Sequence, residues 1–285
     1  MSIEIKNLTY VYNKGTIFAK TALDNINLTI LDGEFIGLIG HTGSGKSTLI
    51  QHLNALLIPT EGYVYLNGED INKDKSKLRE IRQRVGLVFQ YPEHQLFEMT
   101  VFKDVSFGPS NMGLSKEEVI KRTENALKMV GLPESLYEKS PFELSGGEKR
   151  RAAIAGILAM NPEVIILDEP TAGLDPKGRD EILNSIKLMH DELGITVILV
   201  SHSMEDVAKL VNRIIVMDNG EIALSGSPKE VFSKVDILEK MGLAAPQISY
   251  VFKHLKEKGY DVPLDVYTTK EATEKLFDFL KQVDK

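Results

Sequence analysis

Phe35-Ile36-Gly37-Leu38-Ile39-Gly40-His41-Thr42-Gly43-Ser44-Gly45-Lys46-Ser47-Thr48 is the stretch that decides the fold of this chain. Its first five residues form a continuous apolar run, which is typical of a strand covered on both faces. The pattern Gly-x-x-x-x-Gly-Lys-Ser follows, and residues 47–56 read as a helix. A glycine loop between a buried strand and a helix start binds phosphate, because backbone N–H groups and the positive helix end converge on the anion.

The loop assigns roles to individual residues. We expect the backbone amides from Gly43 to Thr48 to wrap a β-phosphate, while Lys46 reaches the β- and γ-phosphates and the Ser47 hydroxyl binds Mg²⁺. The candidate nucleotide-binding residues of this loop are Gly40, His41, Thr42, Gly43, Ser44, Gly45, Lys46, Ser47 and Thr48.

A pair of carboxylates ends a second apolar strand. Asp168 and Glu169 follow Val164-Ile165-Ile166-Leu167, so both emerge at the carboxyl edge of the predicted sheet, where open α/β sheets bind ligands. We expect Asp168 to serve as the Mg²⁺ carboxylate. Glu169 is then placed to orient and deprotonate a water that attacks the γ-phosphate.

A third segment, Leu144-Ser145-Gly146-Gly147-Glu148, also has the composition of a phosphate contact. A hydroxyl is followed by two residues without side chains at the start of a predicted helix, so Ser145, Gly146 and Gly147 can approach an anion closely. Taken with the loop and the paired carboxylates, this segment predicts ATP as the ligand.

The order of the other elements predicts an α/β chain. Residues 3–12 and 23–30 alternate like half-buried strands, and strands and helices alternate from 164 to 217, as in a parallel sheet. Helical periodicity dominates 92–160 and returns in 227–285. The further strands expected are 62–66, 85–89, 164–168, 196–200, 213–217 and 221–224, and the helices are 47–56, 77–84, 116–130, 176–193, 204–211, 248–258 and 271–282.

Composition narrows the possible partners. The chain has 285 residues, a formal net charge of -7 and no cysteine. This charge argues against general nucleic-acid binding and against direct adhesion to anionic lipid, and the absence of cysteine is compatible with a reducing cytosol. The N-terminus lacks the layout of a signal peptide, and no apolar run reaches the ~18 residues of a membrane span. We therefore expect no direct membrane span, and any membrane role must pass through a partner.

The three motifs resemble the nucleotide-binding subunit of an ABC transporter, over about residues 3–225. The resemblance implies a P-loop NTPase fold of the ABC ATPase type, with a mainly parallel core sheet, an N-terminal antiparallel β subdomain, a helical subdomain at about 92–160 and a small helical C-terminal extension. It places the ATPase domain at 1–226 and the extension at 227–285. It also implies ATP and Mg²⁺ as ligands, and hydrolysis coupled to transport.

The resemblance implies further roles. Gln90 corresponds to a glutamine that touches Mg²⁺ and the attacking water and senses the transmembrane partner. His202 corresponds to a histidine that contacts the γ-phosphate, although a lone histidine after an apolar strand is more often structural. Ala172-Gly173-Leu174-Asp175 corresponds to the D-loop. Two such ATPases bind two nucleotides at their interface, each between one chain's glycine loop and the other's Ser-Gly-Gly segment.

Adenine has two candidate aromatic partners. Tyr12 lies just ahead of the loop into the second strand and is the expected stacking residue, with Tyr10 as the competing choice. A purely packing role for Tyr12 is the third alternative.

The Ser-Gly-Gly segment departs from the family pattern at one position. Glu148 stands where glutamine is usual, and an acidic group near phosphate could weaken affinity or tune release. Lys149-Arg150-Arg151 follows, either offsetting this charge or forming a solvated helix face. The sequence does not decide the effect of Glu148 on turnover.

Residues 89–98 and the run Phe107-Gly108-Pro109 resemble the ATPases of energy-coupling factor importers of vitamins and metal ions, most closely the second of the paired ATPases. This resemblance implies a paired ATPase subunit (heterodimer or homodimer), a transmembrane coupling subunit, a substrate-binding membrane subunit, and a peripheral position on the cytoplasmic face of the membrane. Leu96 and Phe97, flanked by Glu93 and Glu98, are expected to line the groove for the coupling subunit. The transported substrate and the role of the extension stay open.

Three other functions compete with this interpretation. A cobalt or nickel importer ATPase would have almost the same sequence. A soluble ABC ATPase without a transporter is a second alternative. A non-hydrolysing, ATP-gated scaffold is a third, and the presence of both Glu169 and His202 argues against it.

Overall fold

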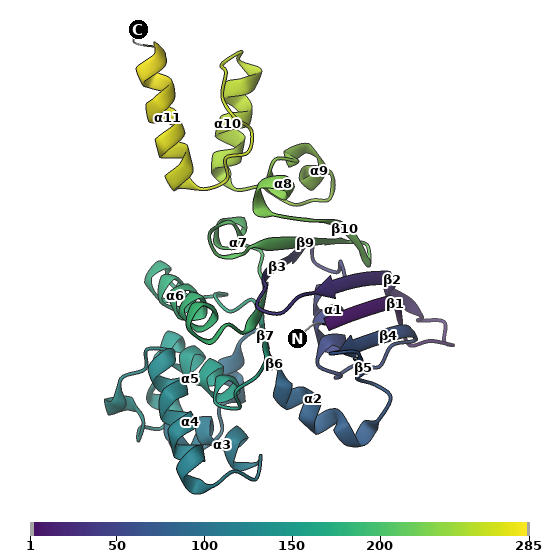
Figure 1. Ribbon diagram of the computed structural model, residues 1–285, viewed down its shortest axis with the longest axis vertical. Coiled ribbons are helices and arrows are strands. Elements are labelled where there is room, and N and C mark those ends of the chain that lie inside the picture. The colour runs from purple at the N-terminus through teal and green to yellow at the C-terminus, as the bar shows by residue number, and fades with distance from the viewer. Residues whose placement is uncertain (1–2, 284–285) are drawn as a thin grey trace.

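The computed structural model describes residues 3–283, and side chains as far as residue 277. The ends of the two expected domains, residues 1–2 and 284–285, lie outside the described part. Two sheets and a set of helices form the structure (Figure 1). The strands are β1 Ile3–Tyr12, β2 Lys20–Ile30, β3 Phe35–Gly40, β4 Glu61–Leu66, β5 Glu69–Asp70, β6 Val85–Val88, β7 Val164–Asp168, β8 Thr196–Val200, β9 Arg213–Asp218 and β10 Glu221–Gly226.

The α-helices cover the sheets or extend beyond them. They are α1 Lys46–Leu53, α2 Leu78–Arg84, α3 Val101–Ser110, α4 Lys116–Met129, α5 Gly146–Leu158, α6 Pro176–Leu193, α7 Met204–Leu210, α8 Pro228–Phe232, α9 Val235–Lys240, α10 Gln247–Glu257 and α11 Thr269–Val283.

The larger sheet has six strands in the order β10-β9-β3-β8-β7-β6. The neighbours from β9 to β6 pair in parallel, and only β10 joins antiparallel, through a tight turn at Asn219 and Gly220. Strands β3, β6 and β8 are buried along their whole length, because helices cover both faces of a parallel sheet. The expected mainly parallel core sheet is confirmed.

The order of these strands positions the site. Strand β8 lies between β3 and β7, and all three run in the same direction. Their carboxyl ends therefore meet at one edge, so the segments that follow them, beginning at His41, Glu169 and Ser201, become neighbours.

The second sheet is antiparallel, with the order β2-β1-β4-β5, and confirms the expected N-terminal β unit. Its inner face, including Ile5, Ile26 and Val64, joins one hydrophobic core with Leu38 and Ile198 of the larger sheet. The phosphate-binding loop and α1 therefore rest against both sheets.

Helices α3, α4 and α5 form the helical insertion, which lies beside α6 and away from the antiparallel sheet (Figure 1). Val105, Leu127 and Ile154 are buried in the same core as Leu167 and Leu199 of the larger sheet. The insertion is thus packed onto the sheet. Its exact limits, expected at about residues 92 and 160, stay a prediction.

The C-terminal helices α10 and α11 project from the far side of β10 (Figure 1). They enclose a small core of their own made of Phe252, Val262, Val266 and Ala272, and the Ser249 hydroxyl donates to the carbonyl of Val266. The domain boundary expected at residue 226 also remains a prediction.

Two helices differ from expectation. Helix α1 ends at Leu53 rather than residue 56, because the backbone at Ala55 adopts a positive φ of 55° that no helix continues through. Helix α3 was not singled out in the sequence, where Phe107-Gly108-Pro109 was used only as a family motif. The helix extends one residue past Pro109, so the proline removes one intrahelical hydrogen bond close to its end.

Candidate functional site

The loop between β3 and α1 can be formed only with glycine at particular positions. Gly45 has a φ of 104°, in the left-handed region that favours glycine. A side chain at Gly40 would bring its Cβ within 2.5 Å of the carbonyl oxygen of Met217. The loop therefore bends tightly against β9 and exposes its backbone N–H groups at the sheet edge.

Lys46 occupies the inside of this loop. Its side chain is nearly buried, and Nζ donates to the carbonyl oxygens of Gly40 at 2.7 Å and of His41 at 3.1 Å. Burial lowers the pKa of Lys46, and the nearby carboxylates of Glu169 and Asp168 oppose that effect. The ammonium group is thus held where a phosphate entering the loop would meet it.

Asp168 and Ser47 are in contact. Burial raises the pKa of Asp168, while the Lys46 charge and the Ser47 hydroxyl, which donates to the carboxylate, oppose the rise. Within the part of the chain that the structure describes, no cluster of three or more His, Asp or Glu side chains could hold a metal. A hydroxyl beside one carboxylate nevertheless fits Mg²⁺, because this ion keeps water and phosphate ligands and takes few from protein.

Glu169 has the properties of a general base. Burial, reinforced by the charge of Asp168, raises its pKa to about 7, although the backbone N–H of His202 and the charge of Lys46 oppose the rise. Its Oε1 atom is buried without a hydrogen-bond partner, so it is free to accept from a bound water. The Nε2 atom of His202 lies 3.4 Å from it. Burial, with the charge of Lys46 adding, lowers the pKa of His202, which favours the neutral ring.

One cleft of about 450 Å³ brings these groups together. Of the predicted site residues, it is lined by Tyr12, Thr42, Gly43, Gly45, Lys46, Ser47, Thr48, Gln90, Asp168, Glu169 and His202. Gly40 and Ser44 lie behind this lining. The side chain of His41 also turns away, and its Nε2 atom lies 3.0 Å from Oδ1 of Asp218.

The two tyrosines differ in position. Tyr12 is 37% exposed and lines the cleft, with its hydroxyl 3.2 Å from that of Thr48. Tyr10 packs edge-on against His52, at 4.7 Å between ring centroids, and joins the core. Tyr12 therefore has the accessible ring face that a nucleotide base needs.

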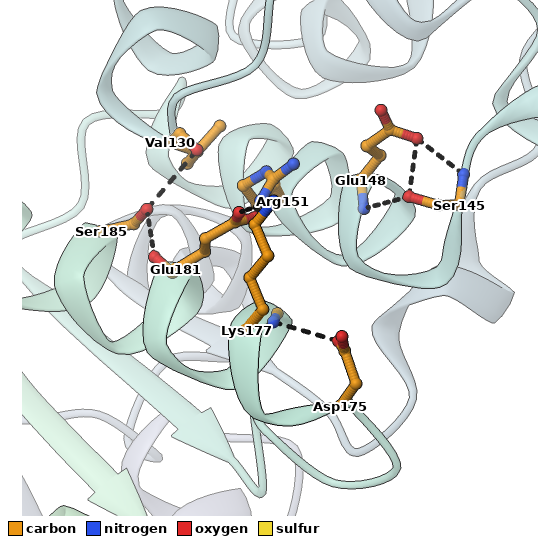
Figure 2. A network of polar contacts seen from close by, with 9 residues as sticks. Val130, Ser145, Glu148, Arg151, Asp175, Lys177, Glu181 and Ser185 are labelled. Carbon is orange, nitrogen blue, oxygen red and sulfur yellow. Dashed lines mark hydrogen bonds and ion pairs between the residues drawn. The ribbon is translucent and has the colours of Figure 1, made fainter.

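Ser145, Gly146 and Gly147 lie outside the cleft, at the start of α5. The Ser145 hydroxyl donates to Oε2 of Glu148 at 2.7 Å, and the same oxygen accepts from the Ser145 backbone N–H at 2.7 Å (Figure 2). The Ser145 hydroxyl oxygen also accepts from the backbone N–H of Glu148 at 3.4 Å, so the two residues form a capping box with the carboxylate at the positive helix end. The pKa of Glu148 is lowered, chiefly by the Ser145 hydroxyl and N–H.

The family profile described as ABC transporter matches residues 23–172. The chain belongs to the ABC transporter family. It is 57% identical over 281 residues to the energy-coupling factor transporter ATP-binding protein EcfA2 of Caldanaerobacter subterraneus subsp. tengcongensis, covering 99% of this chain and 98% of the relative. The protein of the same name from Clostridium tetani is 59% identical over 277 residues, covering 97% and 96%. These matches place the chain in the energy-coupling factor branch, and they extend the resemblance beyond residue 225 into the C-terminal helices.

Solved structures agree with this assignment. The structure of cbiO1 from Clostridium perfringens, described as part of the ABC transporter complex cbiONQ, is similar with a TM-score of 0.76 and 41% identity, covering 88% of this chain and 98% of that one. A dimeric post-hydrolysis state of the ATP-binding cassette MJ0796, bound to ADP and Pi, is similar with a TM-score of 0.71 and 36% identity, covering 79% and 98%. The fold expected for the ABC ATPase type is confirmed.

The basic run after the Ser-Gly-Gly segment of this ABC ATPase is not a solvated face. Arg150 is only 2% exposed and pairs with Glu93. Figure 2 shows that Arg151 pairs with Glu181. Glu93, which was expected in an exposed stretch that lines a groove, keeps 17% of its side chain exposed in this pair, and its place in a partner groove stays a prediction. The charge of Arg151 still contributes to lowering the pKa of Glu148, as a smaller cause than the capping contacts.

Two contacts near the site escaped sequence reasoning. His41 and Asp218 are 177 residues apart, and Arg150 and Glu93 are 57 apart. Neither pair has a local spacing that could have revealed it. Only the parallel strand order and the packing of α5 bring these partners together.

Proposed function

We propose that this chain binds and hydrolyses ATP as a subunit of an energy-coupling factor importer that takes up vitamins or other micronutrients. The observation that carries the proposal is the convergence of Lys46, Glu169 and His202 in one cleft, with a carboxylate whose pKa of about 7 suits proton abstraction near neutral pH. The identity to energy-coupling factor ATPases over nearly the whole chain supports the transport role.

The geometry gives each residue a task in hydrolysis. The amides from Gly43 to Thr48 and the Lys46 ammonium hold the β- and γ-phosphates, and Tyr12 stacks on adenine. Ser47, Gln90 and Asp168 would hold Mg²⁺, which when bound neutralises charge on the phosphates.

Glu169 accepts the proton of the attacking water at Oε1, and the neutral His202 ring contacts the γ-phosphate from the end of β8. The two act together because their side chains already face each other across 3.4 Å. A γ-phosphate placed beside both side chains would be attacked by a single oriented water at Oε1 rather than by bulk water.

The separation of Ser145–Gly147 from the cleft supports a dimeric mechanism. We propose that this segment completes the ATP site of a second ATPase subunit, identical or related, and that the partner's equivalent segment completes the cleft of this chain. Closure on ATP and opening after hydrolysis would then move the membrane subunits.

A second cavity fits the expected transmembrane partner. A groove of about 610 Å³ opens between α2, α3 and α5, with Leu96, Phe107 and Gly156 among its apolar walls and Arg79 and Arg82 also lining it. We propose that a helix of the coupling subunit docks here, which would place this chain on the cytoplasmic face of the membrane. Over the described residues no helix is long and apolar enough to cross a bilayer.

Affinity isolation from native membranes tests this function. A tagged chain should recover a second ATPase subunit, a transmembrane coupling subunit and a substrate-binding membrane subunit, and the isolated complex should hydrolyse Mg-ATP. Recovery of the chain without membrane proteins would contradict the transport role and would favour a soluble ATPase.

A further inference from the structure

Arg150 is the largest side chain that the fold buries completely among the described residues. It lies on the first turns of α5, five positions after Ser145. A buried arginine is costly unless every charge and donor is satisfied, so its partners identify what it holds together.

The guanidinium group uses all of its N–H donors. Nη2 donates to both carboxylate oxygens of Glu93, at 2.9 and 3.2 Å, and Nε donates to one of them at 3.3 Å. Nη1 donates to the carbonyl oxygens of Pro170 at 3.0 Å and Ala172 at 2.7 Å. A lysine ammonium has three donors and no planar fork, so it could not keep this arrangement.

Arg150 and its partners come from three segments near the proposed sites. Glu93 belongs to a short 3-10 helix, Pro92–Gln95, three residues after Gln90, and Gln95 of the same helix lines the proposed docking groove. Pro170 and Ala172 follow Glu169 directly. The helix that carries Arg150 begins at the Ser145–Gly147 segment.

Among the described residues, Arg150 is the one cation that forms an ion pair with Glu93. Burial alone would raise its pKa, but the hydrogen bonds and charge of Arg150 outweigh burial, and the pKa is lowered. The Tyr91 ring packs beside the same guanidinium, 6.0 Å from its centroid to Cζ. The contact is therefore a fixed ion pair between the 3-10 helix Pro92–Gln95 and α5.

We propose that Arg150 and Glu93 are a positioning pair that couples the docking groove to both nucleotide half-sites. Displacement of the 3-10 helix by the membrane partner moves Arg150, which shifts the start of α5 and the backbone that follows Glu169 together. Neither side chain touches nucleotide, so the pair acts only through the residues it positions. This inference rests on the proposed function.

The test compares two rates and one affinity. The rates are Mg-ATP hydrolysis by the isolated membrane complex and by the pair of ATPase subunits alone, and their ratio measures coupling. The affinity is the Kd of the full chain for ATP. Arg150→Lys and Glu93→Gln should each lower the ratio by ~5-fold or more, the lower end of typical coupling between sites, and leave the Kd within about twofold. The double variant should be no worse than Arg150→Lys alone, because both changes break one contact.

Glu163→Gln is the matched control. Glu163 pairs with Arg84 at 2.7 Å and also joins segments distant in sequence, but it touches neither the groove nor a nucleotide segment. Its ratio should equal that of the unchanged protein. The coupling role would be overturned if folded Glu93→Gln had the same ratio of hydrolysis rates as the unchanged protein. It would also be overturned if the ratio fell only as much as the affinity for ATP fell. A wild-type complex that does not hydrolyse ATP would instead refute the proposed function itself.

Discussion

Oε1 of Glu169 and Nε2 of His202 lie 3.4 Å apart at the carboxyl ends of two adjacent strands, and that glutamate oxygen has no hydrogen-bond partner. The parallel pairing of β7 with β8 creates this proximity, since the two residues follow those strands directly. The proposed base and the proposed phosphate contact are thereby positioned by the sheet rather than by a mobile loop.

The pH dependence of hydrolysis should report on Glu169. Its pKa of about 7 means that the base is protonated below neutrality and ionised above it. The specificity constant kcat/KM for Mg-ATP, which reports ionisation of the free enzyme, should therefore rise as pH increases through about 7 and level off above pH 8. Initial rates at Mg-ATP concentrations well below KM from pH 5.5 to 9 measure this, and a flat kcat/KM profile across pH 6 to 8 would be incompatible with Glu169 as the base.

The same pKa predicts a stability effect. Burial raises the pKa of Glu169 from 4.5 to about 7, so the unfolded chain ionises first as pH rises and the folded state loses stability. Glutamine does not ionise, so Glu169→Gln should not show this loss. Without nucleotide, the unfolding free energy of Glu169→Gln minus that of the unchanged protein should therefore increase by about 2 kcal/mol between pH 5 and pH 8. Urea unfolding at the two pH values measures it, and an equal difference at both would contradict the shifted pKa.

If Tyr12 stacks on adenine, substitutions of Tyr12 and Tyr10 should differ in their effect on the KM for ATP. Tyr12→Ala should raise the KM for ATP ~5-fold or more, because the loss of an aromatic face costs about 1–3 kcal/mol per base. Tyr12→Phe keeps the ring and should stay within about twofold. Tyr10→Ala is the matched comparison and should leave the KM of the folded variant within about twofold, and a larger effect there than for Tyr12→Ala would reverse the assignment.

The negative charge of Glu148 should weaken the predicted phosphate contact of Ser145. Glu148→Gln removes this charge, while the glutamine amide oxygen can still accept from the Ser145 hydroxyl and N–H in the capping box. We expect a KM for ATP that is about threefold lower in the ATPase pair, together with a small loss of stability, since a negative charge at the positive helix end contributes ~0.5 kcal/mol. Steady-state kinetics and thermal unfolding measure the two effects. An unchanged or higher KM would show that the charge of Glu148 does not weaken ATP binding.

The sequence was sufficient for the core of the site because its signals are local. The apolar runs that end at Ile39, Leu167 and Val200 predicted strands, and the glycine loop predicted its own turn. Parallel strand order then made Lys46, Glu169 and His202 neighbours, without any need for side-chain detail.

The role of Arg150 depended on packing that no local pattern records. The sequence left Arg150 as either a counter-charge or a solvated residue, whereas burial between three segments makes it an internal ion pair. The contact between Ser145 and Glu148 is different, because Ser-x-x-Glu is the spacing of a capping box and could have been recognised from the sequence.

Replacement of Glu169 by glutamine tests the central claim most directly. The isolated membrane complex is compared with its Glu169→Gln and Glu163→Gln versions, which change glutamates at opposite ends of the β7 region. The measured quantities are the turnover number for Mg-ATP and the affinity for ATP. We predict that Glu169→Gln lowers turnover by at least ~10²-fold with ATP binding retained, and that Glu163→Gln changes neither. Normal turnover in Glu169→Gln would contradict the account.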